Sequence, residues 1–414
     1  MWQKTKNIYH LQQAIIASLL YRFPSRGMKI IGVTGTDGKT TTANLIYHIL
    51  HESGKKAAVI SSVGAIIDGK KFDLAFHVTT PGRFAVQSYI RKARKAGIKY
   101  IVLEVTSHAL DQHRIYGIHI DVGVVTNITR EHLDYHKTYE NYVHAKAKLL
   151  KKAKIAILNK DDQSYVRIKK YELRKDKKIV TYGLKKDSDI NPHVFPFQSK
   201  LLGKFNVYNC LAAIAVLQHL HISEEAIRKG LLSFRLPEGR QEIVYNKEFM
   251  VINDFAHTPN SFSVILPEIK YLTKGRLIHV FGSAARRDTY KRPEMGKISA
   301  KYSDIIVLTS EDPRDEAPDN ITNDILSGIS SFQFPISNDK ENIALEKGKK
   351  YIFKINDRKE AIRFAISLAQ KGDTVLLTGK GHEKSINYGK GEEPWSETAI
   401  AQEAIEMKAN GLLS

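Results

Sequence analysis

The sequence predicts an α/β protein with a P-loop, doubly wound central domain and a C-terminal Rossmann-like α/β domain. First, an apolar run at residues 30–33 leads into a glycine-containing loop and then into apolar residues at helical spacing. Second, strand-like and helix-like segments alternate up to about residue 217, and a new alternation begins beyond residue 240. Third, polar and glycine-rich residues gather where the strands end, which is typical of the binding edge of a doubly wound sheet.

The 414 residues are enough for two or three domains, each with its own core. We expect a helical remnant or linker over residues 1–27, a central domain over 28–234 and a C-terminal domain over 235–414. The run Pro237-Glu238-Gly239-Arg240 has the composition of a joint between two domains.

The composition is strongly basic, since 64 Lys and Arg against 44 Asp and Glu give a net charge of +20. The lysines are spread along the chain and do not cluster with arginines and aromatic residues. We therefore interpret the charge as solvated surface plus attraction for phosphorylated ligands, and we expect no nucleic-acid partner.

Cys210 is the only cysteine, which excludes an intramolecular disulfide and a cysteine-based metal site. This favours a reducing compartment, and we expect a cytoplasmic protein. No apolar run approaches the roughly 20 residues that span a bilayer. Residues 8–21 are apolar but include His10, Gln12 and Gln13. We expect a helix packed on the first domain there, with weak contact to a membrane surface as the alternative.

The stretch from residue 29 to residue 53 predicts a strand, a phosphate-binding loop and a helix. Glycines allow backbone N–H groups to turn toward phosphates, and a helix N-terminus adds partial positive charge. A lysine after the second glycine can reach the outer phosphates, and the next hydroxyl can bind Mg²⁺. The spacing departs from the common pattern because Val33 stands where its first glycine would be. The loop residues are Gly35, Thr36, Asp37, Gly38, Lys39, Thr40 and Thr41.

The remaining elements of the central domain follow in order. We expect strands at 56–62, 100–105, 121–126 and 155–158, and helices at 83–95, around Lys146 and at 203–217. Residues 164–199 are basic and weakly periodic, and we interpret them as a variable or hairpin region. Glu104 ends one strand, and its carboxylate suits Mg²⁺, which prefers oxygen ligands.

The C-terminal domain is predicted from four further strands, each of which ends in charged or glycine-rich residues. These strands are expected at 249–252, 277–282, 305–309 and 374–378. Their following loops contain DFAHTP, RRD, EDPR and GKGHE, respectively.

The chain resembles the Mur ligases, the ATP-dependent amide-forming enzymes of peptidoglycan synthesis. Within that family it is most similar to the MurE type, which adds a diamino acid to a muramoyl dipeptide. The resemblance rests on many motifs in the family's order, over about residues 8 to 385: GTDGKTT, TTP, EVTSHALDQHR, TNITREHLDYH, LNKDD, GKFNVYN, GRQE, DFAHTP, RDTYKRPEM, EDPRDE and GKGHE.

The resemblance implies that ATP phosphorylates a substrate carboxylate and that an incoming amine then attacks the acyl-phosphate. It implies two Mg²⁺ ions held by Thr40, Glu104, His132 and Lys146, with Lys146 carbamylated. It also implies that Arg240 meets the phosphates from the C-terminal domain. The residues implied around the adenosine are Asn206, Asn209, Asp254 and His257.

The implied substrates are a muramoyl-peptide precursor and a diamino acid. Contacts with the muramoyl peptide are implied for Thr79, Thr80, Thr106, Gln112 and Arg114. Contacts with the incoming amino acid are implied for Arg287, Asp312, Arg314, Gly379 and Glu383. An arginine at position 314 is expected to bind the far carboxylate of meso-diaminopimelate, which lysine lacks.

Several positions depart from the family pattern. The family's usual N-terminal domain for uridine diphosphate is essentially missing, since only 28 residues precede the first strand. Thr106 replaces serine, Glu131 replaces aspartate and Asp312 replaces asparagine, and Asp312 adds negative charge that favours a cationic substrate end. Alanines also stand at 284 and 285, where glycine is usual.

Other functions stay open at this point. They are a ligase of the same superfamily with a lipid-linked or folate-type acceptor, a ligase that adds lysine, a non-catalytic ATP-binding module and a nucleic-acid-binding NTPase. The sequence leaves the oligomeric state and the carrier of the acceptor undecided.

Overall fold

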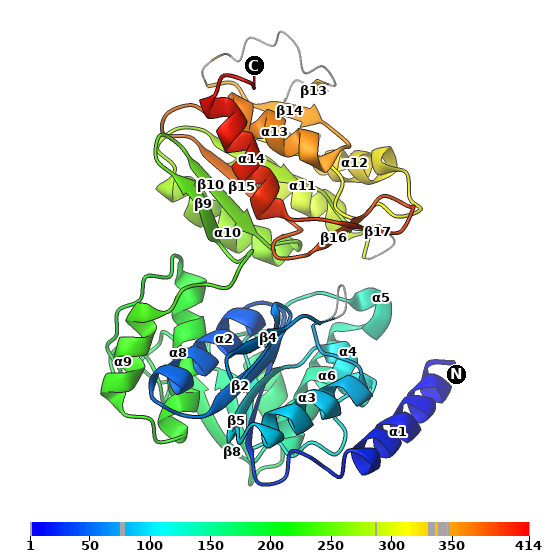
Figure 1. The fold of residues 1–414 in the computed structure, drawn as a ribbon, viewed down its shortest axis with the longest axis vertical. Coiled ribbons are helices and arrows are strands. Elements are labelled where there is room, and N and C mark those ends of the chain that lie inside the picture. The colour runs from blue at the N-terminus through cyan, green and yellow to red at the C-terminus, as the bar shows by residue number, and fades with distance from the viewer. Residues whose placement is uncertain are drawn as a thin grey trace. The chain divides into compact units, whose positions relative to one another are not determined.

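The computed structural model describes residues 2–74, 79–285, 288–329, 336–337, 346 and 348–413. Figure 1 shows the fold as a ribbon. The chain divides into two compact units, Met1–Arg235 and Leu236–Ser414. Each unit has its own sheet and its own hydrophobic core.

The first unit is built from strands and helices in alternation. In chain order its elements are α1 (Trp2–Leu20), β1 (Lys29–Thr34), α2 (Lys39–Glu52), β2 (Ala57–Ser61), β3 (Gly64–Ile67), β4 (Lys70–Phe72), α3 (Arg83–Lys95), β5 (Tyr100–Glu104), α4 (Ser107–Asp111), β6 (Val122–Val125), α5 (Leu133–His136), α6 (Tyr139–Lys152), β7 (Ile155–Asn159), α7 (Ser164–Arg167), the π-helical turn η1 (Ile168–Glu172), β8 (Lys178–Tyr182), α8 (Lys204–His219) and α9 (Glu224–Ser233).

Within its described residues, the first unit has an eight-stranded sheet in the order β4-β3-β2-β5-β1-β6-β7-β8. The six strands from β2 to β8 in this order run parallel, and β3 and β4 extend one edge antiparallel. The carboxyl ends of β1, β2, β5 and β6 therefore meet at one edge, where ligands bind in such sheets.

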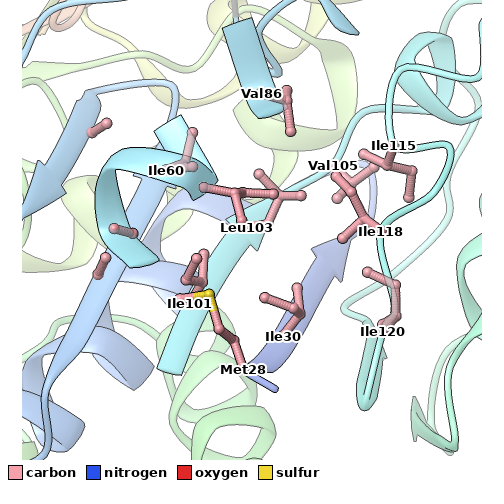
Figure 2. Close-up of a cluster of buried hydrophobic side chains, with 14 of the residues drawn as sticks. Met28, Ile30, Ile60, Val86, Ile101, Leu103, Val105, Ile115, Ile118 and Ile120 are labelled. Atoms are coloured by element: carbon pink, nitrogen blue, oxygen red, sulfur yellow. The ribbon is translucent and has the colours of Figure 1, made fainter. Parts of the chain in front are cut away.

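The parallel strands are apolar on both faces because helices cover both. Figure 2 shows the cluster on one face, in which Ile30, Ile101 and Leu103 of the sheet gather with Val86 of α3. On β1, Gly32 allows close packing of α6, since a Cβ there would lie 2.7 Å from Leu149 Cδ1.

The second unit has the same type of architecture. Its elements are β9 (Glu242–Asn246), β10 (Met250–Asp254), α10 (Pro259–Leu272), β11 (Leu277–Phe281), α11 (Lys291–Tyr302), β12 (Ile305–Leu308), α12 (Pro318–Ser327), β13 (Ile336–Ser337), β14 (Tyr351–Lys354), α13 (Arg358–Leu368), β15 (Thr374–Thr378), β16 (Ser385–Asn387), β17 (Glu392–Pro394) and α14 (Glu397–Ala409).

In its described part, the second unit has a sheet in the order β13-β14-β12-β11-β15-β10-β9, parallel except for β9. One core cluster includes residues of α13 and α14, and the other includes residues of α10, α11 and α12. The two clusters lie on opposite faces of the sheet, as in a Rossmann-like domain, and Figure 1 shows these helices along the sheet.

Residues 164–199 were interpreted as a variable or hairpin region, and the structure contradicts the hairpin. The structure has α7, η1 and then β8, which pairs parallel with β7 at the sheet edge. An edge strand buries little side-chain surface and therefore needs few apolar residues, so apolar periodicity does not predict it. The short antiparallel strands β3, β4 and β9 and the parallel strand β14 were also absent from the expected elements.

Candidate active site

The loop between β1 and α2 is shaped by two glycines. Gly38 has φ of 78°, and a Cβ there would lie 2.3 Å from Asn209 Oδ1. A Cβ on Gly35 would lie 1.8 Å from Thr126 Oγ1. Neither position tolerates a side chain, so the backbone of the loop can turn its N–H groups inward.

Hydrogen bonds from the end of β6 hold the same loop. Asn127 Oδ1 accepts from Asp37 N at 2.9 Å, and Asn127 Nδ2 donates to Asp37 O at 3.1 Å. Thr126 Oγ1 donates to the same carbonyl at 2.6 Å. Thr36 N donates to Asn127 O at 2.8 Å. These contacts tie the loop to the carboxyl end of the neighbouring strand β6.

Lys39 begins α2 and lies against the loop. Its ammonium donates to Thr36 O at 2.7 Å. A lysine held at a helix N-terminus beside inward-facing N–H groups is the arrangement that binds nucleotide phosphates. The next residues, Thr40 and Thr41, are buried at the start of α2.

Thr40 and Glu104 meet at the carboxyl edge of the sheet, as the strand order requires. Thr40 Oγ1 donates to Glu104 Oε1 at 3.0 Å. The other carboxylate oxygen accepts from Ser62 N at 2.9 Å, and Ser62 Oγ lies 3.0 Å from Thr40 Oγ1. This group combines hydroxyl and carboxylate oxygens, which are the donors that Mg²⁺ prefers. Sequence reasoning missed Ser62, although it directly follows a strand that neighbours β5.

Lys146 projects from α6 into the underside of the loop. It is 1% exposed, and its Nζ donates to Gly35 O at 2.6 Å and lies 4.5 Å from the centroid of the Tyr142 ring. Burial, followed by the nearby Lys39 ammonium, holds the pKa of Lys146 well below its usual value. Carboxylates of Glu131, Asp37 and Glu104 counteract this shift only in part. The surroundings therefore disfavour the ammonium relative to that of an exposed lysine.

His132 reaches the same region from the loop before α5. It adopts the left-handed conformation with φ of 54°, and its Nε2 lies 3.7 Å from Glu131 Oε2. Burial lowers the pKa of His132, which favours the neutral imidazole. Its ring packs edge-on against His108 at 4.9 Å between centroids.

Of the residues implied to hold metal, direct contact links Thr40 to Glu104, and electrostatic interaction links Lys146 to Glu104 and His132. Among the described residues, no group of three or more His, Cys, Asp or Glu forms a ready-made metal site. The fit to Mg²⁺ thus depends on the Thr40 hydroxyl and the Glu104 carboxylate.

The two asparagines implied near the adenine lie on one face of α8. Asn209 Nδ2 donates to Asn206 Oδ1 at 3.0 Å, and Asn206 Nδ2 donates to Leu202 O at 2.7 Å. Asn209 Oδ1 also accepts from Thr42 Oγ1 at 3.2 Å. Both side chains are buried, so α8 ties this pair to the helix that follows the phosphate loop.

The residues implied to contact the muramoyl peptide form one network beside β5. Thr80 Oγ1 donates to Glu104 O and accepts from Thr106 N, both at 3.0 Å. Arg114 donates to Thr80 O at 2.7 Å and to Gln112 Oε1 at 2.9 and 3.1 Å. The network ties this group to the strand that carries Glu104. Thr79 precedes Thr80 and is half-buried.

In the second unit, Arg240, Asp254 and His257 gather at the end of β10. Asp254 accepts from Gln241 N and Ala256 N, both at 2.7 Å. Burial raises the pKa of Asp254, and the nearby Arg240 guanidinium opposes that shift. Arg240 stacks over Phe255 with its Cζ 4.5 Å from the ring centroid, and His257 Nδ1 lies 2.8 Å from Phe255 O.

A buried cation that sequence reasoning did not single out lies beside two of the residues predicted to contact the incoming amino acid. Lys380 Nζ lies 3.0 Å from Asp312 Oδ1 and 2.7 Å from Glu383 Oε2, and Lys380 is fully buried. Sequence reasoning could have found Lys380 because it lies between the two glycines of the GKGHE motif. Gly379 has φ of 109°, and a Cβ there would lie 2.9 Å from Glu311 Oε2.

Arg314, another residue predicted to contact the incoming amino acid, has an unusual backbone. Its φ is 50°, and its N donates to Asn387 O at 3.0 Å. Its Nε is buried and has no hydrogen-bond partner among the described residues. A non-glycine residue in this conformation is uncommon and occurs often at ligand sites. The position predicted for Arg287 lies outside the described residues.

A formed phosphate loop at the carboxyl edge of a doubly wound sheet, next to an oxygen-rich Thr–Glu group, defines a P-loop enzyme that uses a nucleotide. Comparison with known proteins identifies the family. Residues 33–217 match the Mur ligase middle domain, and residues 239–381 match the Mur ligase glutamate ligase domain.

Two relatives match most of this chain. The UDP-N-acetylmuramoyl-L-alanyl-D-glutamate–2,6-diaminopimelate ligase of Aquifex aeolicus is 38% identical over 400 residues, or 92% of this chain and 78% of that protein. The UDP-N-acetylmuramyl-tripeptide synthetase of Deinococcus radiodurans is 37% identical over 412 residues, or 94% and 80%.

A solved structure of a UDP-N-acetylmuramoyl-L-alanyl-D-glutamate–2,6-diaminopimelate ligase is 29% identical with a TM-score of 0.61, covering 93% of this chain and 80% of that one. The chain belongs to the Mur ligase family, whose members are ATP-dependent ligases. The predicted family and the predicted enzyme class are thereby confirmed. In the described part of the chain, no helix is long and apolar enough to cross a membrane.

Proposed function

We propose that this ligase joins a diamino acid, meso-diaminopimelate, to a muramoyl-L-Ala-D-Glu acceptor through an acyl-phosphate. Relatives that are 37–38% identical are named as ligases of 2,6-diaminopimelate. The observation that carries the proposal is the pairing of Thr40 with Glu104 at the phosphate loop, next to the Thr80–Arg114 network. The acceptor carboxylate and the nucleotide phosphates would then bind at the same edge of the sheet.

The phosphate loop and Lys39 would hold ATP, and Thr40, Glu104 and His132 would hold Mg²⁺. The metal would neutralise charge on the phosphates while the acceptor carboxylate attacks the terminal phosphorus. In that step an oxygen–phosphorus bond forms, and ADP leaves with the bonding electron pair. The incoming amine then attacks the acyl carbon, and phosphate leaves with one carboxylate oxygen.

Lys146 would carry a carbamate. A neutral amine attacks carbon dioxide and releases a proton, and the carbamate oxygens then resemble a carboxylate. The lowered pKa of Lys146 supports this modification because the ammonium has no electron pair for attack. The carbamate would help to hold a second Mg²⁺, and the burial of Lys146 beside the phosphate loop supports this role.

The residues predicted to contact the incoming amino acid favour a substrate end that carries a carboxylate. The charge of Asp312, which replaces the family's asparagine, is paired with Lys380. Asp312 therefore adds little attraction for a cationic end. Among the described residues, the buried Arg314 Nε has no hydrogen-bond partner, so it suits a carboxylate, whereas Glu383, like Asp312, already pairs with Lys380. Lysine would leave the arginine unpaired, at a cost of about 2 kcal/mol or roughly thirtyfold.

The test is ATP consumption with a UDP-linked muramoyl dipeptide and a panel of diaminopimelate, lysine and ornithine, with products read by mass. We expect diaminopimelate to be preferred about thirtyfold. A heavy-oxygen label in the acceptor carboxylate should appear in the released phosphate. Preference for lysine would refute the pocket argument, and unlabelled phosphate would refute the acyl-phosphate.

A further inference from the structure

α1 is turned with its apolar side toward solvent. The exposed fractions of six large apolar residues on this helix range from 36% to 62%. Their spacing puts them on one side of the helix, which we call the α1 apolar face. The face consists of Ile8, Tyr9, Ile15, Ile16, Leu19 and Leu20.

The opposite side of α1 is small and polar, and it is the side that packs on the first unit. Ser18 Oγ donates to Tyr116 O at 3.1 Å and accepts from Gln87 Nε2 at 3.2 Å. Near the other end, Asn7 Nδ2 donates to Asp111 Oδ2 at 3.0 Å. These contacts fix the rotation of α1, although a surface helix ordinarily buries its apolar side. Figure 1 shows α1 on the outside of this unit, near α3.

The segment that contains α1 and the neighbouring helix α3 are both rich in basic residues. Residues 2–26 contain four Lys or Arg, and α3 contains five, while neither segment contains Asp or Glu. Arg91 of α3 lies over the Tyr21 ring, with 5.9 Å between its Cζ and the ring centroid. The nine basic residues are Lys4, Lys6, Arg22, Arg26, Arg83, Arg91, Lys92, Arg94 and Lys95.

Large exposed apolar side chains gathered on one side of a helix, here with the exposed Gln12 among them, indicate an interaction surface. Pairing with a second copy through this face would bring like charges together. An anionic bilayer instead offers apolar chains to the helix and negative headgroups to the basic residues. We propose that the α1 apolar face and the basic residues of α3 bind the surface of an anionic lipid bilayer, with α1 lying in the membrane plane.

Flotation of the full chain with lipid vesicles tests this proposal. We expect the protein to float with vesicles of phosphatidylcholine and phosphatidylglycerol, and to float much less with phosphatidylcholine alone. Added salt should weaken the binding because it screens the headgroup charge.

Two paired variants separate the apolar and the basic contributions. Ile16→Ser with Leu20→Ser should weaken binding roughly tenfold for each side chain, since each loses its burial in the lipid. Arg94→Gln with Lys95→Gln should weaken binding roughly fivefold for each charge. The matched control is Leu232→Ser, which removes an apolar side chain 41% exposed on α9 and should leave flotation unchanged. Unchanged ligase turnover would show that all variants fold.

Three results would overturn the proposal. One is the absence of flotation with anionic vesicles. Another is flotation that is indifferent to lipid charge and salt. The third is a concentration-dependent dimer that dissociates in the Ile16→Ser, Leu20→Ser variant while no vesicle binding occurs, because the face would then belong to a second copy.

Discussion

Replacing Lys146 with methionine should stabilise the protein while abolishing its activity. The amine is fully buried and its pKa lies well below the usual value, so the native state holds fewer protons than the unfolded state. In the unfolded chain, this lysine has a pKa of about 10.4 and is protonated at pH 9. In buffer free of carbon dioxide, losing that proton on folding lowers the free energy of unfolding by about 2 kcal/mol at this pH. Methionine also loses the hydrogen bond to Gly35 O, which destabilises the variant by about 1 kcal/mol. The net gain for Lys146→Met is about 1 kcal/mol.

The pH dependence has a definite sign. Between the native and the unfolded pKa of Lys146, the unfolded state binds one proton more, so the free energy of unfolding rises with pH. The wild-type profile should therefore contain a positive slope of about 1.4 kcal/mol per pH unit that the Lys146→Met profile lacks. Urea unfolding followed by circular dichroism at a series of pH values measures both quantities.

Lys148→Met is the matched control on the same helix. Lys148 pairs with Asp111 at 2.8 Å and is partly exposed, so this variant should lose at most about 1 kcal/mol and keep most of its activity. For Lys146→Met, turnover should fall about a thousandfold or more. A Lys146→Met protein that is destabilised and still active would refute the reasoning, since Lys146 would then be a structural amine.

Three further predictions follow from the contacts. Arg314→Ala should reduce kcat/KM for diaminopimelate by about thirtyfold or more and change lysine activity little. The control Arg363→Ala on α13 should change neither activity. Equal losses for both amino acids would exclude Arg314 as the selective residue. Glu104→Gln should raise the Mg²⁺ concentration needed for half-maximal activity by roughly tenfold or more while ATP still binds, and an unchanged Mg²⁺ requirement would remove Glu104 from the metal site. Arg358→Leu should lower the free energy of unfolding by about 3–5 kcal/mol because it leaves the buried Glu397 carboxylate without its cation. The double variant Arg358→Leu with Glu397→Leu should lower it less. An equal or greater loss in the double variant would argue against the unpaired charge as the cause.

Most elements of both sheets were predictable from apolar periodicity. Predicted strands at 100–105 and 374–378 correspond to β5 and β15, and the predicted helix at 83–95 corresponds to α3. Buried parallel strands give long apolar runs, which explains this success. The edge strand β8 was misread because an edge buries too little surface to leave such a run.

The meeting of Thr40 with Glu104 was also predictable from sequence. Each follows or ends a parallel strand, and parallel strands present their carboxyl ends at one edge. Some roles stay predictions that activity assays of variants can test. They are the roles assigned to Lys146, His132 and the Arg240–Asp254 group, for which the structure shows the surrounding contacts.

By itself, the sequence determined the fold class, the phosphate loop and the family, because those depend on local pattern and on motif order. Only the tertiary structure decided the partner of Asp312, since Lys380 lies 68 residues away in the chain and meets it through the parallel pairing of strands. The direction of the α1 apolar face was likewise decided by packing. Periodicity shows that one side of a helix is apolar, but the contacts of Ser18 and Asn7 determine which side meets the protein.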